Sequence, residues 1–212
     1  MTNYIVIGNG TSRQGINISI LSDISETFGC NHIYQDYKVK NLIAADRSIA
    51  QEIVSSGMHN LTNFYTREKW YNLFGLPHNV NPFPVLVKEG MNKWEHADNW
   101  GSGLYACYIA CLGQPDKISL LGFDLDGFNS VSKNDIYKEK LLQIPGSSTF
   151  RADKPVDASF WIKQFLLLFS WFPNIEFEFV NNHTWKQPDS FLTYNNYRFL
   201  TYDKFNKDFD LD

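Results

Sequence analysis

The feature of this sequence that most restricts its fold is the alternation of short apolar runs with stretches of helical spacing. The first run, Tyr4–Ile7, is rich in β-branched residues and is stopped by Gly8, as in a buried strand of a parallel sheet. Similar runs predict further strands at residues 29–34, 41–46, 61–66, 117–123 and 176–180, the last one in the chain. Spacings of three and four predict a helix at residues 16–28, and residues 48–56 and 67–74 are also typical of helices. Small and apolar residues on all sides predict a buried helix at residues 100–112, and an amphipathic pattern predicts one at residues 155–172.

This order of elements predicts an α/β fold: a three-layer, Rossmann-like, mainly parallel sheet with helices on both faces. Pro82 and Pro84 restrict residues 79–87 to an edge strand or a loop. Residues 127–156 have the polar composition of a lid-like excursion. We therefore expect one Rossmann-like domain over residues 1–182 and a C-terminal tail, residues 183–212, that packs on it.

Length and charge exclude several classes of protein. With 212 residues, 43% of them hydrophobic, the chain suffices for one sizeable core but is short for two. A net charge of −4 and a pI of about 5.7 leave no basic surface for nucleic acid. No apolar run is long enough for a membrane span, and no secretion signal precedes the first strand. We expect a cytoplasmic protein, with homo-oligomer formation left open.

The cysteines and histidines lack the spacing of a metal site. The three cysteines are an odd number without a CxxC pair, which argues against a disulfide framework and a structural zinc ion. Cys107 and Cys111 lie four apart on a predicted helix and are interpreted as small packing residues. The five histidines form neither an HxH nor an HExxH motif, so a histidine metal centre is not expected.

Two glycine-containing turns are expected at the carboxyl ends of the strands, where parallel sheets bind ligands. In Gly8-Asn9-Gly10-Thr11-Ser12, missing β-carbons would let backbone N–H groups approach a phosphate or a ring edge. The loop is neither a complete dinucleotide fingerprint nor a P-loop, and a tight βα turn is the alternative. Gly101-Ser102-Gly103 opens a helix whose N-terminus could bind an anion or simply be capped. Together the turns predict a phosphate-bearing ligand.

Two acidic residues follow the strand predicted at residues 117–123. Asp124 and Asp126 have the Asp-x-Asp spacing with which alternate carboxylates bind a divalent ion that bridges a diphosphate. Aspartates at the end of a strand also cap and solvate a turn, and this structural interpretation is favoured. We therefore expect no metal, with these two residues as the candidate ligands should one bind.

These segments resemble a known family. Gly8–Ser12 is similar to the GNGPS loop of the bacterial sialyltransferases of glycosyltransferase family 42, and residues 29–32 are similar to their RCNQ segment. Residues 101–113 and 118–124 resemble their TSGVY helix and the strand that ends in G-I-D-F. The loops also resemble pyrophosphokinase-like proteins of pterin biosynthesis. The patterns GNGTS, GCN and SG-x-x-A are most similar to those of small phage-encoded proteins of unassigned function.

The resemblance implies a site for a nucleotide. It places the nucleotide and its phosphate against the loop at residues 8–12, the donor against Asn31, and the ribose or phosphate against the turn at residues 102–103. Tyr137 would act as a lid tyrosine, and Asp46 replaces a donor-binding asparagine, so its carboxylate would repel anionic sialic acid. The candidate nucleotide-binding residues are Gly8, Asn9, Gly10, Thr11, Ser12, Asn31, Asp46, Ser102, Gly103, Asp124 and Tyr137.

The general base of the family is not found. In the family it is a histidine just before the helix expected at residues 156–172, but this chain has Arg151-Ala152-Asp153-Lys154 there and no histidine between His96 and His183. Asp153 and Asp157 are interpreted as helix caps. Three functions are compatible: a glycosyltransferase with a CMP- or UDP-type nucleotide-sugar donor other than sialic acid, a non-catalytic nucleotide-binding module, and a Mg²⁺-dependent pyrophosphokinase-like transferase.

Overall fold

The computed structural model describes residues 1–75, 79–86, 100–125, 136–137 and 158–211. In these residues one sheet has the strand order β5-β4-β3-β2-β1-β6-β7-β8, and every pair of neighbours is parallel. The strands are β1 (Asn3–Ile7), β2 (Glu26–Cys30), β3 (Asn41–Ala44), β4 (Asn63–Thr66), β5 (Val80–Pro82), β6 (Lys117–Leu121), β7 (Glu176–Asn181) and β8 (Tyr197–Thr201). The helices are α1 (Leu21–Ile24), α2 (Arg47–Ser55), α3 (Glu68–Phe74), α4 (Ser102–Leu112), α6 (Ala158–Trp171) and α7 (Tyr202–Asp208). Four 3-10 turns complete the described elements: η1 (Thr11–Arg13), η2 (Asn31–Gln35), η3 (Met58–Asn60) and η7 (Asp189–Thr193).

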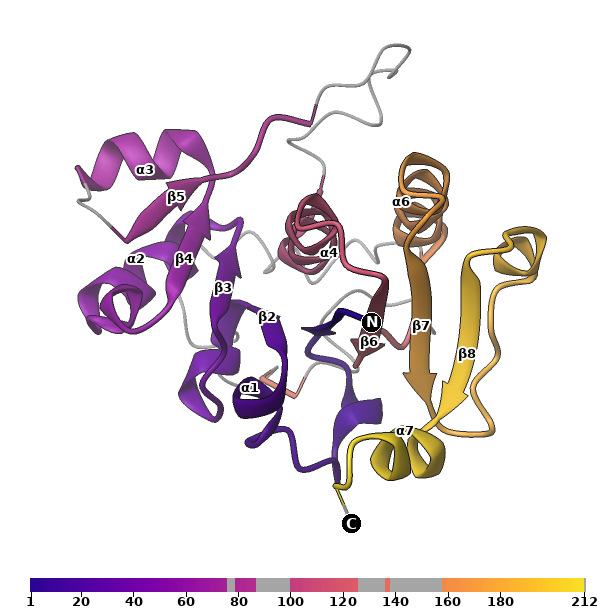
Figure 1. Cartoon of the computed structure of the whole chain (residues 1–212). Helices are drawn as coiled ribbons and strands as arrows, with labels where there is room; N and C mark the ends of the chain where they lie inside the picture. The colour runs from indigo at the N-terminus through magenta and orange to yellow at the C-terminus, as the bar shows by residue number, and fades with distance from the viewer. Residues whose placement is uncertain (76–78, 87–99, 126–135, 138–157, 212) are drawn as a thin grey trace.

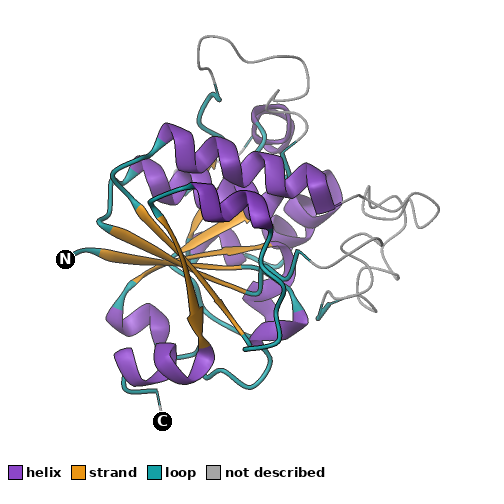
Figure 2. Ribbon diagram, turned by 90° about the vertical axis from the view of Figure 1, so that its right-hand side faces the viewer, coloured by secondary structure: helices purple, strands orange, loops and turns teal. Residues whose placement is uncertain are grey.

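Helices cover both faces of the sheet, which confirms the predicted three-layer α/β fold (Figure 1, Figure 2). Successive side chains of a strand point to opposite faces, so Val6 belongs to the core under α4 and α6. Its neighbours Ile5 and Ile7 belong to the second core, which α1, α2 and α7 cover. Both cores need apolar residues along the whole strand, which explains the unbroken run in β1.

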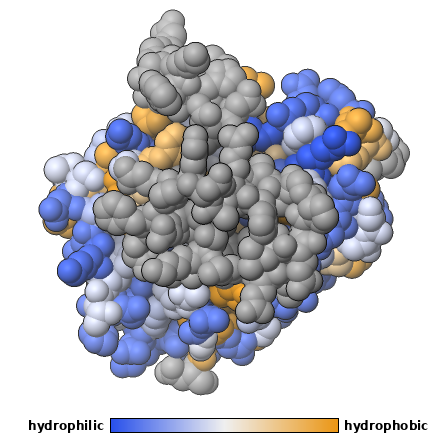
Figure 3. Space-filling view, turned by 180° about the vertical axis from the view of Figure 1, so that it is seen from behind, coloured by the Kyte–Doolittle hydropathy of each residue, from blue (hydrophilic) through white to orange (hydrophobic). Residues whose placement is uncertain are grey.

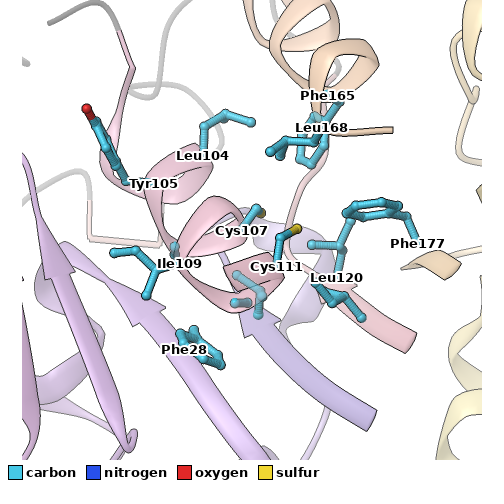
Figure 4. Close-up of a cluster of buried hydrophobic side chains, with 14 of the residues drawn as sticks. Phe28, Leu104, Tyr105, Cys107, Ile109, Cys111, Leu120, Phe165, Leu168 and Phe177 are labelled. Carbon is cyan, nitrogen blue, oxygen red and sulfur yellow. The ribbon is translucent and has the colours of Figure 1, made fainter. Parts of the chain in front are cut away.

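Helix α4 packs on β1, β2 and β3, beside α6 on the same face of the sheet (Figure 4). Its Cys107 and Cys111 are buried and free, as expected for small packing residues. They lie among the side chains of Leu120 and Phe165, and burial raises the pKa of both thiols well above its ordinary value. Because the helix is buried on nearly every side, its position relative to the strand ends is fixed by packing.

The predictions for residues 16–34 were wrong in part. The helix expected over residues 16–28 shrinks to α1, and the strand expected over residues 29–34 lies earlier, as β2. Thr27 and Phe28 suit a strand, and β2 pairs with β1 over residues 26–29, so sheet pairing overrides the helical spacing. The predicted end of that strand is instead the 3-10 turn η2.

The sheet continues beyond the strand that we predicted to be the last. Residues 197–201 form β8, which pairs with β7 in parallel register. Trp185, in the connection, stacks on Phe179 with ring centroids 5.8 Å apart. The segment predicted as a packed tail therefore also supplies an edge strand and α7. At the opposite edge, the proline-containing segment forms β5, as expected.

The described surface carries no large exposed apolar patch in the view of Figure 3, where apolar side chains stand in small groups among hydrophilic ones. None of the helices in the described ranges has the length and apolarity that a bilayer crossing requires. Most of the predicted excursion at residues 127–156 lies outside the described residues, as do Asp126, Asp153 and Asp157.

Candidate functional site

The strand order creates a switch point at the carboxyl ends of β1, β2 and β6. From β1 the chain moves outward through β2 to β5, and it then returns through α4 to β6 on the other side of β1. Connections that leave a strand in opposite directions leave room between their loops, and ligands of parallel sheets bind there. Most of the predicted site residues lie in these loops: residues 8–12 after β1, Asn31 after β2 and Asp124 after β6.

The glycine loop after β1 is held against the end of β6. The N–H groups of Gly8 and Gly10 donate to the carbonyl oxygens of Leu121 and Gly122, at 2.7 and 3.0 Å. A β-carbon on Gly8 would lie 2.5 Å from the Gly122 carbonyl oxygen, so only glycine allows this approach. We expected these amides to bind phosphate; in this conformation their protons are used inside the protein, and close packing explains the glycines.

Asp124 caps the short turn η1. Its carboxylate accepts hydrogen bonds from the Ser12 hydroxyl, from the Ser12 N–H at 3.2 Å and from the Thr11 hydroxyl at 3.5 Å. A β-carbon on Gly10 would lie 2.6 Å from this carboxylate. On its other side, the Trp185 ring nitrogen donates to the Asp124 carbonyl oxygen at 2.6 Å. We call Gly10, Thr11, Ser12 and Asp124 the aspartate corner; its geometry matches the capping interpretation of Asp124.

The N-terminus of α4 reaches the same edge of the sheet. The Ser102 hydroxyl oxygen accepts a hydrogen bond from the N–H of Ala45, which follows β3, at 2.9 Å. The ring of Phe123 lies between this turn and the glycine loop, 3.3 Å from the β-carbon positions of both Gly8 and Gly103. The two predicted turns are thus close together, but a phenyl ring separates them.

Two asparagines of the predicted site have buried oxygens without a partner. Asn9 donates from Nδ2 to the Cys30 carbonyl oxygen at 3.2 Å, which places its amide beside the end of β2. Asn31 follows Cys30 directly and has a left-handed backbone, with φ of 55°. The Oδ1 atoms of both side chains are buried and accept no hydrogen bond. An unpartnered buried acceptor costs free energy, so these side chains are suited to a ligand that donates hydrogen bonds.

Beside the asparagines, the ring of His32 contacts Glu52 of α2. Its Nε2 atom lies 3.3 Å from Glu52 Oε2, while its Nδ1 atom is buried without a partner. Glu52 Oε1 also accepts hydrogen bonds from the Tyr34 hydroxyl and, at 2.9 Å, from Gln35 Nε2. Burial chiefly, with the neighbouring carboxylate adding to it, raises the pKa of Tyr34 to about 12. We call Asn9, Asn31 and His32 the acceptor edge.

Tyr137 lies under this edge rather than in solvent. It is buried, and its hydroxyl accepts a hydrogen bond from the Arg13 guanidinium at 3.4 Å. Arg13 is itself buried and donates from Nε to the Gly8 carbonyl oxygen at 2.7 Å. The N–H of Ile136 donates to the Asn9 carbonyl oxygen at 2.9 Å. Residues 136–137 therefore hold the outer side of the glycine loop, and the predicted phosphate contact of Tyr137 stays a prediction.

Asp46 lies farther along the same edge, at the N-terminus of α2. The carbonyl oxygen of its neighbour Ala45 accepts two hydrogen bonds, from Arg67 Nε at 3.1 Å and from the Trp70 ring nitrogen at 3.0 Å. A second Arg67 nitrogen donates to the Trp100 carbonyl oxygen at 3.0 Å. These bonds tie β3, α3 and the start of α4 together around Asp46. No group of three or more potential metal ligands occurs in the described part of the chain.

Comparison with solved structures gives a match for the fold. No family model and no curated protein sequence matches the chain. The monofunctional α-2,3-sialyltransferase Cst-I of Campylobacter jejuni matches with a TM-score of 0.52 and 20% identity over 84% of this chain and 75% of that one. An α-2,3-sialyltransferase from Campylobacter jejuni in apo form matches with a TM-score of 0.50 and 18% identity over 92% and 79%. The chain has a sialyltransferase-like fold.

Within this sialyltransferase-like fold, sequence analysis missed three residues of the site. Arg13 and His32 are buried and Glu52 is half-buried. Arg13 is bonded to the predicted site residues Gly8 and Tyr137, whereas Glu52 contacts His32, which follows Asn31.

His32 was placed beside Asn31 in the segment that resembles the RCNQ motif and was tested as a metal ligand, but no binding or catalytic role was predicted for it. Glu52 lies 20 residues farther along the chain, on a helix, and its spacing from His32 follows no motif. The available signal was that Glu52, a charged residue, lies beside the buried residues Ile49 and Ile53 of α2.

Proposed function

We propose that this protein binds a nucleotide sugar and acts as a glycosyltransferase whose donor is not sialic acid. The observation that carries the proposal is the acceptor edge: buried Oδ1 atoms of Asn9 and Asn31 without partners, at the switch point of the sheet. Ribose and hexose hydroxyls and the amino group of cytosine are hydrogen-bond donors that satisfy such oxygens. The likeness of the fold to two sialyltransferases supports the same class of ligand.

The charge of the site favours a neutral sugar over an anionic one. Glu52 adds a carboxylate at the acceptor edge and Asp46 adds another at the N-terminus of α2, while the guanidinium of Arg13 is bonded to Gly8 and Tyr137. A ligand carboxylate placed there would be repelled by these groups. A CMP- or UDP-linked neutral sugar is the donor class that fits.

The magnesium-dependent alternative has less support. Its candidate ligand Asp124 already accepts hydrogen bonds from Thr11 and Ser12, which a bound metal would have to displace. The non-catalytic alternative differs from our proposal in turnover, not in binding.

A thermal-shift screen of nucleotides and nucleotide sugars tests the proposal, because a ligand that binds only the folded state raises Tm. We expect a cytidine or uridine nucleotide to raise Tm, and Asn9→Ala or Asn31→Ala to weaken its binding about tenfold, equivalent to about 1.4 kcal/mol. Asn63→Ala is the control, since this asparagine is exposed at the start of β4. If no nucleotide raises Tm, the proposal is wrong.

A further inference from the structure

His32 is a buried histidine with one ring nitrogen bonded and the other free. It is 1% exposed. Nε2 lies 3.3 Å from Glu52 Oε2, whereas Nδ1 is buried and has no hydrogen-bond partner. A neutral imidazole carries its proton on one nitrogen and a lone pair on the other. Glu52, as an acceptor, holds the proton on Nε2, so the lone pair is on Nδ1.

Glu52 is fixed in this role by its own neighbours. The Tyr34 hydroxyl and Gln35 Nε2 both donate to Oε1, which leaves Oε2 for the histidine. The Glu52 side chain is 33% exposed, so its charge is only partly screened by water. A carboxylate held in this way orients the ring and stabilises the imidazolium that forms when Nδ1 takes up a proton.

The unpartnered Nδ1 atom lies in η2, the segment that follows β2 and also contains Asn31. Asn31 precedes His32 in the chain, and the Asn9 amide is bonded to the Cys30 carbonyl oxygen one residue earlier. The ring of Tyr137 lies 6.0 Å from the His32 ring, and the Tyr137 hydroxyl is bonded to Arg13. Burial chiefly, with Asp36 adding to it, raises the pKa of Tyr137. Three buried atoms without a partner, on Asn9, Asn31 and His32, thus follow the ends of β1 and β2.

We propose that His32 is the proton acceptor of this site and that Glu52 is its positioning residue. This inference rests on the proposed function, in which a nucleotide sugar supplies the reacting carbon. The oxygen of an acceptor hydroxyl or of water forms a bond to the anomeric carbon, and its proton moves to His32 Nδ1. The bond between the anomeric carbon and the phosphate oxygen breaks, and its electron pair leaves with the nucleotide. The Nε2 proton stays bonded to Glu52.

The test measures nucleotide release from CMP- and UDP-linked neutral sugars, with binding of each nucleotide determined in parallel by calorimetry. We expect His32→Gln to lower kcat at least about 100-fold with little change in KM, because a positioned general base contributes about that much. Glu52→Gln should lower kcat less and shift the midpoint of the pH–rate profile to lower pH, since the imidazolium loses its anionic neighbour. A merely structural role of Glu52 would leave that midpoint in place.

His59→Gln is the matched control. The Nδ1 atom of His59 is also buried without a partner, but it lies in η3, before β4 and away from the carboxyl ends. This variant should release nucleotide at the wild-type rate. If His32→Gln stays within about threefold of the wild-type kcat, the role of His32 is wrong and the proposed function stands. If nucleotide binds but no sugar donor is cleaved, the non-catalytic alternative replaces both the role of His32 and the transferase activity. If no nucleotide binds, the proposed function itself is wrong.

Discussion

Two neighbouring parts of the same sheet edge differ in whether their buried polar atoms have hydrogen-bond partners. In the aspartate corner, Asp124 accepts hydrogen bonds from Ser12 and Thr11, and the Gly10 N–H donates to the end of β6. At the acceptor edge, Asn9, Asn31 and His32 each keep a buried atom without a partner. Satisfied polar groups stabilise a fold, whereas unsatisfied ones lower its stability and are suited to a ligand. The comparison divides one motif-rich edge into a structural part and a candidate binding part.

The largest effect is expected where the glycine loop contacts β6. In Gly8→Ala the new β-carbon would meet the backbone oxygen of Gly122 at 2.5 Å, and neither strand end can move away freely. We expect the free energy of unfolding to fall by about 2–3 kcal/mol, the usual cost of overpacking. Urea denaturation measures it.

Gly101→Ala provides the control for that substitution. A β-carbon on Gly101 would meet nothing within 4 Å, and its φ of −78° suits any residue. We expect a loss below about 1 kcal/mol, the scale of an N-cap change. Equal stability of Gly8→Ala and the wild type would show that the loop is not packed as described.

The next effect concerns Asp124 and separates the structural part from a metal site. Asp124→Ala removes the acceptor of Ser12 and Thr11, and we expect a loss of about 1–2 kcal/mol. Asp116→Ala is the control, because this aspartate lies before β6 with its side chain 58% exposed. The same denaturation measurements, repeated with Mg²⁺, should give unchanged values. A stabilisation by Mg²⁺ that Asp124→Ala abolishes would instead favour the metal-dependent alternative.

Part of this fold could be predicted from the sequence and part could not. The alternation of apolar runs predicted the parallel sheet, because strands buried on both faces need apolar residues throughout. The periodicity gave a wrong prediction at residues 16–28. Ile18 and Leu21 are buried, but only residues 21–24 are helical, and Phe28 belongs to β2. Spacing alone does not reveal that pairing residues 26–29 with β1 stabilises the fold more than another turn of helix would.

The site was predictable as a set of loops but not as a set of bonds. Gly8 and Gly10 were recognised as close-approach glycines, but sequence could not tell that a carbonyl oxygen of β6, rather than a phosphate, approaches them. The pairing of His32 with Glu52 depends on how α2 packs against η2. Such contacts between distant residues leave no local pattern, so only coordinates reveal them.

A smaller effect on the free energy of unfolding is expected at high pH from Tyr34, whose hydroxyl donates to Glu52. The pKa of Tyr34 is raised from 10.0 to about 12 in the fold, so the folded state favours the neutral hydroxyl. This contribution to stability is complete below about pH 10 and is lost as the pH rises through 12. In Tyr34→Phe, the free energy of unfolding should therefore fall less steeply over this range.

Glu52→Gln separates the two causes of that shift. Burial is the larger cause and the carboxylate the smaller one, so this variant should keep most of the high-pH loss and complete it at a slightly lower pH. Denaturation midpoints measured from pH 9 to 12, together with tyrosinate absorbance, follow both variants. A profile of Tyr34→Phe that coincides with the wild type would contradict the burial of this hydroxyl.

The smallest effect on stability is expected at the acceptor edge itself. Asn31 adopts φ of 55°, a conformation that glycine tolerates better, and its Oδ1 atom has no partner. Asn31→Gly loses no hydrogen bond of that oxygen, and relief of backbone strain offsets the greater freedom of the unfolded chain. We expect its unfolding free energy to stay within about 0.5 kcal/mol of the wild type or to exceed it.

Gln114→Gly is the control, because Gln114 has a φ of 51° after α4. Its unfolding free energy should change as little as that of Asn31→Gly. Only Asn31→Gly should weaken nucleotide binding in calorimetry, since a residue kept for a ligand costs the fold little when it is removed. A marked loss of stability in Asn31→Gly alone would place Asn31 among the structural residues and erase the difference between the two parts of the edge.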